Sequence, residues 1–148
     1  MTVESVGLRQ ASQADADFIY RLVEVTMRAY VEQTWGSFSE EINRRNIAEI
    51  IAAKTYSVIQ CRGEDIGAIS VVRHPDFIQL NQLFILPQYQ NKGIGTSLVR
   101  ELASEAQHTG MPLRLRVLKN NPARRLYERL GFRVSSITPE RVYMELHA

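Results

Sequence analysis

The chain has 148 residues, of which 45% are apolar and 23% are charged. This size and composition allow one buried core without metal ions or crosslinks, so we expect a single domain over residues 1–148. The formal net charge of +2 provides no broad field for binding nucleic acid or an anionic membrane. Cys61, the only cysteine, excludes an internal disulfide and a cysteine-built zinc site.

The first residues argue against a targeting segment. Residues 1–12 contain Glu4 and Arg9 and have no long apolar stretch, as a signal peptide or membrane span would need. The lone cysteine also suits a reducing compartment, so the sequence predicts a cytoplasmic protein. The three histidines are scattered and form no metal-ligand pattern, so we expect no metal site.

Two helices and a hairpin are predicted in the first half. Ser12 and Asp15 resemble a capping pair, and apolar residues then recur at helical spacing to about Tyr30. Ser39 can cap a second helix, which carries isoleucines at residues 42, 47, 50 and 51. Residues 56–59 and 66–72 are rich in β-formers and flank a polar turn, which is typical of a hairpin.

A third strand is predicted over residues 77–86, and its alternation changes phase. Ile78 and Leu80 share one parity, whereas Leu83 and Ile85 have the opposite one. An extra residue at positions 81–82 would form a β-bulge, which bends a strand and redirects its backbone groups. A strand buried on both faces would also explain the pattern.

The second half alternates strands and helices. Apolar spacing predicts a helix over residues 93–108, a strand over 113–117 and a helix that begins at Asn121-Pro122 and ends at Gly131. Residues 132–136 and 141–146 are short strand candidates. The predicted class is therefore α/β, with a mixed sheet.

The junction before the third helix has the character of an anion site. Residues 86–92 form a tight loop that leads directly into Gly93-Ile94-Gly95. Free amides at a helix N-terminus bind phosphate, and glycine lets a pyrophosphate approach the backbone. A Rossmann fingerprint lacks its third glycine here, because Leu98 stands in its place, and a P-loop lacks its Gly-Lys-Ser/Thr.

Two motifs resemble those of the GNAT N-acetyltransferases. The family pattern of Gln or Arg, two residues, Gly, one residue, and Gly or Ala matches residues 90–95. A second pattern matches at Asn120, Ala123, Tyr127 and Gly131-Phe132. The resemblance is strong over residues 77–132 and implies a mixed, largely antiparallel sheet with a β-bulge and a V-shaped splay, flanked by about four helices.

The resemblance also implies acetyl-CoA as cosubstrate. Its pantetheine would lie in the splay, and its pyrophosphate would lie on the loop amides of residues 90–96. Asn120 would contact its arm. The implied cofactor-binding residues are Leu83, Phe84, Ile85, Gln90, Asn91, Lys92, Gly93, Ile94, Gly95, Thr96 and Asn120.

Tyr127 is the implied catalytic residue. When an amine attacks the thioester, a thiolate must leave, and the Tyr127 phenol would protonate it. A second interpretation makes Tyr127 a core residue, since it shares an apolar face with Ala123, Leu126 and Leu130. A backbone amide near Ile85 would polarise the carbonyl.

The residues at the positions where the family often has a general base are not acidic in this chain. Positions that are often acidic on the bulged strand hold Gln79 and Asn81, and neither amide accepts a proton at neutral pH. A water chain, Glu32, His74 or an already deprotonated substrate are the open alternatives.

The acceptor site is expected at the end of the first helix. By the resemblance, Tyr30, Glu32 and Trp35 would face the amine there, together with Gln79 and Asn81. An acid beside aromatic rings suits a cation, although a core tryptophan and a helix-surface glutamate would equally explain Trp35 and Glu32. The predicted function is acetyl transfer to a primary amine of a small molecule or peptide. A protein lysine or N-terminal acyltransferase and a non-catalytic acetyl-CoA-binding module remain alternatives. A homodimer is compatible with an uncovered sheet edge.

Overall fold

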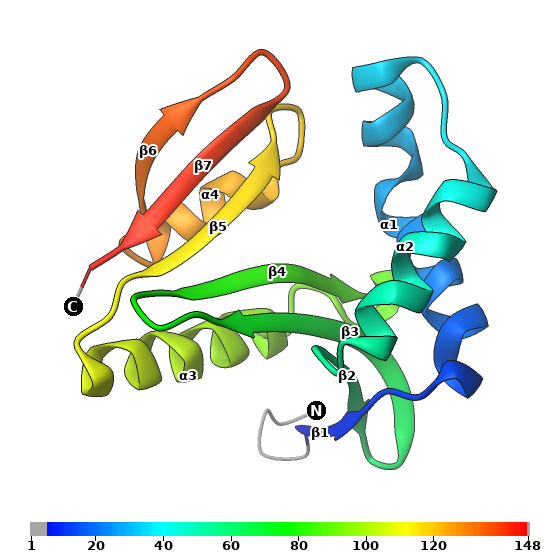
Figure 1. Ribbon diagram of the computed structural model, residues 1–148, viewed down its shortest axis with the longest axis horizontal. Helices are drawn as coiled ribbons and strands as arrows, with labels where there is room; N and C mark the ends of the chain where they lie inside the picture. Colours follow the sequence, from blue (N-terminus) through cyan, green and yellow to red (C-terminus); the bar gives the residue numbers. More distant parts are fainter. Residues whose placement is uncertain (1–5, 148) are drawn as a thin grey trace.

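Helices cover both faces of a seven-stranded sheet in the computed structural model, which describes residues 6–147 (Figure 1). The strand order is β1-β2-β3-β4-β5-β7-β6, and every neighbouring pair is antiparallel except β4–β5. The mixed, largely antiparallel sheet expected from the sequence is thereby confirmed. Its strands are β1 (Val6–Gln10), β2 (Tyr56–Cys61), β3 (Glu64–Arg73), β4 (Ile78–Ile85), β5 (Leu113–Leu118), β6 (Arg133–Ile137) and β7 (Arg141–Leu146).

Two buried clusters form the core, one on each face of the sheet. The helices α1 (Ala16–Trp35) and α2 (Glu40–Ala52) pack on one face through residues such as Leu22 and Ile51. The other face is covered by α3 (Ile94–Thr109) and α4 (Ala123–Arg129), with Leu98 and Tyr127 among the buried residues. Short 3-10 turns, η2 (Gln13–Asp15) and η3 (Pro87–Tyr89), precede α1 and follow β4.

The predicted bulge is present in β4. Ser70 of β3 pairs with Gln82, but the next residue, Val71, pairs with Leu80, so Asn81 has no partner in the ladder. The extra residue resets the alternation. Ile78 and Leu80 before the bulge, and Leu83 and Ile85 after it, all contact the core on the α3 side, whereas Phe84 belongs to the opposite core.

The sheet opens between β4 and β5. These strands pair only where Ile78 meets Leu113 and Gln79 meets Arg114. Beyond that junction they diverge, as Figure 1 shows, and the β5-facing edge of β4 has no neighbouring strand. This is the V-shaped splay expected from the resemblance, and it leaves backbone groups free in the middle of the molecule.

Three features of the first half differ from the sequence predictions or refine them. Strand β1 was not predicted; it is an edge strand in which Leu8 is 50% exposed, so it lacks the alternation of a half-buried strand. Helix α1 runs to Trp35 rather than about Tyr30, because ion pairs such as Arg28–Glu32 continue its surface and Gly36 ends it with a φ of 85°. The Ser12–Asp15 capping box is present but opens the 3-10 turn that leads into α1.

None of the helices within residues 6–147 has the length and apolar character needed to span a bilayer.

Candidate active site

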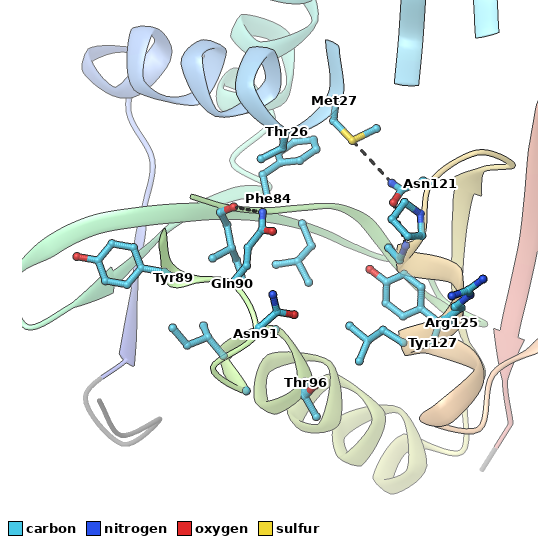
Figure 2. Close-up of a pocket in the computed structure, with 18 of the residues that line it drawn as sticks. Thr26, Met27, Phe84, Tyr89, Gln90, Asn91, Thr96, Asn121, Arg125 and Tyr127 are labelled. Carbon is cyan, nitrogen blue, oxygen red and sulfur yellow. Dashed lines mark hydrogen bonds between the residues drawn. The ribbon is translucent and has the colours of Figure 1, made fainter. Parts of the chain in front are cut away.

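Two adjoining cavities occupy the splay between β4 and β5. The glycine-loop cavity, of about 500 Å³, is bounded by β4, the loop before α3, and parts of α1 and α4 (Figure 2). The arginine cavity, of about 340 Å³, lies between β4, β5 and the α1–α2 layer and includes Arg116 and Arg141. Met27, Leu83, Phe84 and Tyr127 are among the residues that line both. A molecule in one cavity can therefore meet a molecule in the other.

Most of the predicted cofactor residues lie together. They come from the free edge of β4 and from the loop that opens α3, two segments that the η3 turn joins. Those lining the glycine-loop cavity are Leu83, Phe84, Ile85, Gln90, Asn91, Gly93, Ile94, Gly95 and Thr96.

The loop before α3 presents a row of free backbone amides. Asn91 and Gly93 both have left-handed backbone conformations, with φ of 61° and 83°. Among residues 6–147, no acceptor is found for the amides of residues 91–96, and the first helical bond runs from the Ser97 amide to the Gly93 carbonyl at 3.0 Å. Free amides at the positive end of a 16-residue helix attract an anion.

Gln90 lines the glycine-loop cavity and also braces its loop, whereas Lys92 lies outside the lining. The Gln90 amide donates to the Pro87 carbonyl at 3.2 Å, and its side chain donates to the Ile85 carbonyl at 2.8 Å. Gln90 thus fastens the loop to the end of β4, and Figure 2 draws this bond. Lys92 is exposed and is not among the cavity-lining residues.

Asn121, rather than the expected Asn120, lines the cavities. The Asn120 side chain donates to the Tyr30 carbonyl at 3.2 Å and to Gln33 Oε1 at 3.0 Å, so it attaches the β5–α4 segment to α1 outside the cavity. Asn121 lines both cavities, where its side-chain oxygen accepts from the Ala123 amide at 2.9 Å. The side-chain nitrogen of Asn121 lies 3.8 Å from Met27 Sδ (Figure 2).

Tyr127 combines a buried ring with a hydroxyl at the cavities. Its ring is packed edge-on against Phe132, with 5.7 Å between ring centroids, and the residue is 7% exposed. Figure 2 shows the hydroxyl directed into the cavity, where its oxygen stays accessible, and no described residue hydrogen-bonds it. Burial raises the pKa of Tyr127 to about 12, because removal from water disfavours the phenolate. The phenol is therefore protonated at neutral pH.

The predicted acceptor residues are divided. Tyr30 lines the glycine-loop cavity, and Trp35 and Asn81 line the arginine cavity. Glu32 is exposed and pairs with Arg28 at 2.9 Å, and Gln79 lies at the β4–β5 junction. Neither Glu32 nor Gln79 lines either cavity.

Neither candidate base named from the sequence, Glu32 or His74, is among the residues that line the two cavities. His74 stacks on Phe77 in the turn between β3 and β4, with 4.3 Å between ring centroids. Among the described residues, no carboxylate or imidazole lines either cavity.

Sequence reasoning missed several lining residues. Thr26 and Met27 project from the middle of α1, Tyr89 from η3, Arg129 from α4 and Arg141 from β7. None of them belongs to a local motif. Only the helical spacing of α1 carried a signal, because it places Thr26 and Tyr30 on one face.

The splayed and bulged sheet and the free amides before α3 are features that the resemblance to the GNAT N-acetyltransferases implied. The sequence profile of the acetyltransferase (GNAT) domain matches residues 52–134, more than half of the chain. The chain belongs to the GNAT acetyltransferase family. Membership confirms the expected acyl donor, acetyl-CoA, at the level of the family.

Solved structures share this fold at low sequence identity. An acetyltransferase from Thermus thermophilus superimposes with a TM-score of 0.78 at 18% identity, with 100% of each chain covered. The PaiA N-acetyltransferase from Thermoplasma acidophilum, in complex with coenzyme A, gives 0.73 at 21% identity over 97% of this chain and 99% of that one. Ard1 from Thermoplasma volcanium gives 0.72 at 16% identity, over 97% and 98%. No curated protein sequence matches significantly.

Proposed function

We propose that this protein transfers the acetyl group of acetyl-CoA to a primary amine of a small molecule or peptide by direct attack. The observation that carries the proposal is the meeting of two features in one cavity: the unbonded amides of residues 91–96 and the hydroxyl of Tyr127. One feature suits a pyrophosphate, and the other suits a leaving thiolate.

The cofactor would occupy the glycine-loop cavity. Its pyrophosphate would accept hydrogen bonds from the amides of residues 91–96, and its pantetheine would run along the free edge of β4 beside residues 83–85. Arg125 and Arg129 also line this cavity and would balance phosphate charge. Coenzyme A in the Thermoplasma acidophilum relative is consistent with this assignment.

In the proposed reaction the neutral amine attacks the thioester carbonyl carbon from the arginine cavity. The C–N bond forms, the carbonyl oxygen becomes an oxyanion near the backbone amide of Ile85, and the C–S bond then breaks. Tyr127 gives its proton to the departing sulfur. The nitrogen loses its extra proton to water, and a proton from solvent restores the phenol, so that the charges balance.

Burial of Tyr127 has two opposite effects on this step. The pKa of about 12 keeps the phenol protonated but makes it a weak acid. A leaving thiolate partly shielded from water beside Tyr127 would likewise be a stronger base than in bulk water. The two proton affinities therefore move in the same direction, and proton transfer within the cavity remains feasible.

Two other functions use the same cofactor site. A protein lysine or N-terminal acyltransferase would share every feature described for the glycine-loop cavity. A non-catalytic acetyl-CoA-binding module is favoured by one observation, the lack of a carboxylate or imidazole among the described lining residues. The unbonded hydroxyl that Tyr127 presents at the cavity surface favours catalysis, since a binding module has no use for a proton donor.

Isothermal titration with acetyl-CoA is the primary test. Wild type should bind, and Gly93→Glu and Gly95→Glu should both lose binding, because each puts a negative charge where phosphates should lie. Gly110→Glu is the matched control for Gly93, since Gly110 also has a positive φ, of 68°, at the other end of α3. Folded wild-type protein that fails to bind acetyl-CoA would refute the proposed function.

Turnover is the second measurement. An amine screen that follows release of free thiol should find acceptors for wild type and much slower release for Tyr127→Phe. Normal acetyl-CoA binding without any amine-dependent thiol release would identify the binding module instead.

A further inference from the structure

The arginine cavity has an excess of positive charge. Arg116 of β5 and Arg141 of β7 both line it, and no aspartate or glutamate within residues 6–147 does. Neither arginine forms an ion pair with a described residue. By contrast, Arg114, on the same face of β5, is paired with Glu145 at 3.4 Å. The two cationic side chains in the cavity are thus uncompensated.

Strand pairing puts these arginines beside each other. Arg116 lies opposite Tyr143, and Arg141 lies opposite Leu118 in the antiparallel β5–β7 ladder. Arg116 and Arg141 are therefore diagonal neighbours on one face of the sheet, close enough for two long side chains to reach one anion. The α1–α2 layer, through Trp35 and Asn43, forms the opposite wall.

Each guanidinium is held by one neutral contact. Arg116 Nη2 donates to Asn81 Oδ1 at 3.3 Å, and the Arg141 guanidinium lies over the Trp35 ring, 5.3 Å from its centroid. A guanidinium has five N–H donors, so most donors on both side chains remain available. Arg141 is half-buried and Arg116 is exposed, which leaves the cavity open to a solute.

We propose that the acceptor of this acetyltransferase is a small amine that also carries a carboxylate, and that Arg116 and Arg141 bind that carboxylate. The inference rests on the proposed function. Arginine pairs carboxylates bidentately, and about 340 Å³ fits a molecule the size of an amino acid. A diamine or a lysine-rich protein segment would bring further positive charge to a site that has no acid in its described lining.

The same charges assist the reaction. A positive potential disfavours an ammonium ion and favours the free amine, the form that attacks a thioester. The arginine pair therefore replaces part of what a general base does: it lowers the proton affinity of the bound amine while holding the other end of the molecule.

Trp35 provides a readout that is independent of turnover. It is the only tryptophan in the chain and contacts Arg141, so its fluorescence reports a ligand arriving at that guanidinium. With saturating coenzyme A present, we would titrate the common L-amino acids, their α-carboxamides and 2-aminoethyl phosphate. We expect saturable changes with one or more amino acids and at least about tenfold weaker binding of the matching carboxamides.

Single substitutions test whether Arg116 and Arg141 are the side chains that bind the carboxylate. Arg116→Gln and Arg141→Gln should each weaken binding of the responding amino acid about tenfold and leave carboxamide binding and acetyl-CoA titration unchanged. Arg133→Gln is the control, because Arg133 is exposed on β6, away from both cavities. In turnover, KM for the amino acid should rise more than kcat falls.

Several results would overturn the inference. These are equal binding of amino acids and carboxamides, an equal loss for both in the arginine variants, a response only to 2-aminoethyl phosphate, or no response to any of these probes. If acetyl-CoA binds normally in such a case, the proposed function stands and only the acceptor class is wrong. Failure of acetyl-CoA binding together with a carboxylate response would refute the proposed function instead.

Discussion

The glycine-loop cavity and the arginine cavity share the splay but differ in what they are made of. The first presents backbone amides of one continuous loop, positioned by two left-handed residues and a helix dipole. The second presents side chains from α1, α2, β4, β5 and β7. A backbone site suits a ligand common to a whole family, because it depends little on side-chain identity. A side-chain site can change its ligand through single substitutions.

The largest expected effect tests whether Tyr127 acts in the chemical step rather than in binding at either cavity. Tyr127→Phe removes the proton donor and should lower kcat by about 10²–10⁴-fold, with the acetyl-CoA dissociation constant unchanged. Steady-state assays and calorimetry measure the two quantities. Tyr20→Phe is the control, since Tyr20 is also buried but lines neither cavity. Equal losses in the two variants would make Tyr127 a packing residue.

The next effect tests how strongly the backbone site depends on β4. A Cβ at Gly67 would overlap the Phe84 carbonyl oxygen and come within 3.2 Å of Ile59 Cδ1. Gly67→Ala should therefore displace β4, lower the free energy of unfolding by about 1–3 kcal/mol and weaken acetyl-CoA binding. Urea unfolding and calorimetry measure both changes.

Gly95→Ala is the matched control for this prediction. A Cβ at Gly95 would meet only Ile85 Cδ1 at 3.5 Å and Leu83 Cδ2 at 3.9 Å, which are ordinary contacts. Near-normal stability and binding are expected. If Gly67→Ala were as mild as Gly95→Ala, the position of β4 would be less constrained than its packing indicates.

At alkaline pH, ionisation of the buried Tyr127 should affect stability in a way that ionisation of solvent-exposed tyrosines does not. Burial raises the pKa of Tyr127 from 10.0 to about 12, so the folded state holds a proton that the unfolded chain releases above pH 10. Its stabilising contribution is complete below pH 10 and is lost as pH rises toward 12, at about 1.4 kcal/mol per pH unit.

Urea unfolding at pH 9 and pH 11 measures this loss. The drop in unfolding free energy should be smaller in Tyr127→Phe than in wild type. Burial also raises the pKa of Tyr56, whose hydroxyl bonds to Gln82. The drop in unfolding free energy should therefore also be smaller in Tyr56→Phe than in wild type. Identical drops in wild type and Tyr127→Phe would contradict the burial-shifted pKa.

The smallest expected effect alters the side-chain site alone. Asn81→Asp would put a carboxylate next to Arg116 and neutralise one of the two cations. Affinity for an amine with a carboxylate should fall by about two- to fivefold, as expected for a partly exposed ion pair, and acetyl-CoA binding should not change. Competitive fluorescence titration and calorimetry measure the two affinities. A gain in affinity for the carboxylate would contradict the assigned role of Arg116.

The difference between the backbone-built cavity and the side-chain-built cavity also explains which features could be predicted from the sequence. The glycine loop, the bulge at Asn81 and the alternation of the second half are local patterns, because neighbouring residues create them. The fold class and the confirmed bulge followed from such patterns.

Residues brought together only by folding had no comparable signal. Arg141 reaches the arginine cavity through the register of β5 with β7, and no spacing in the sequence encodes that register. Asn120 and Asn121 are adjacent, and only the geometry of the helix start decides that Asn121 enters the cavity while Asn120 bonds to α1. Strand β1 escaped prediction because an exposed edge strand needs no apolar alternation.

The short pairing of β4 with β5 affects how cooperatively the protein unfolds. Two residue pairs link β4 to β5, and thereby strands β1–β4 to strands β5–β7. Side-chain packing must therefore supply most of the unfolding cooperativity between these two parts of the sheet. A pantetheine that bonds to the open edge of β4 would act as a substitute strand. Hydrogen exchange along that edge should slow when cofactor is present, and at a hundred times its dissociation constant the ligand would stabilise the fold by about 2.7 kcal/mol.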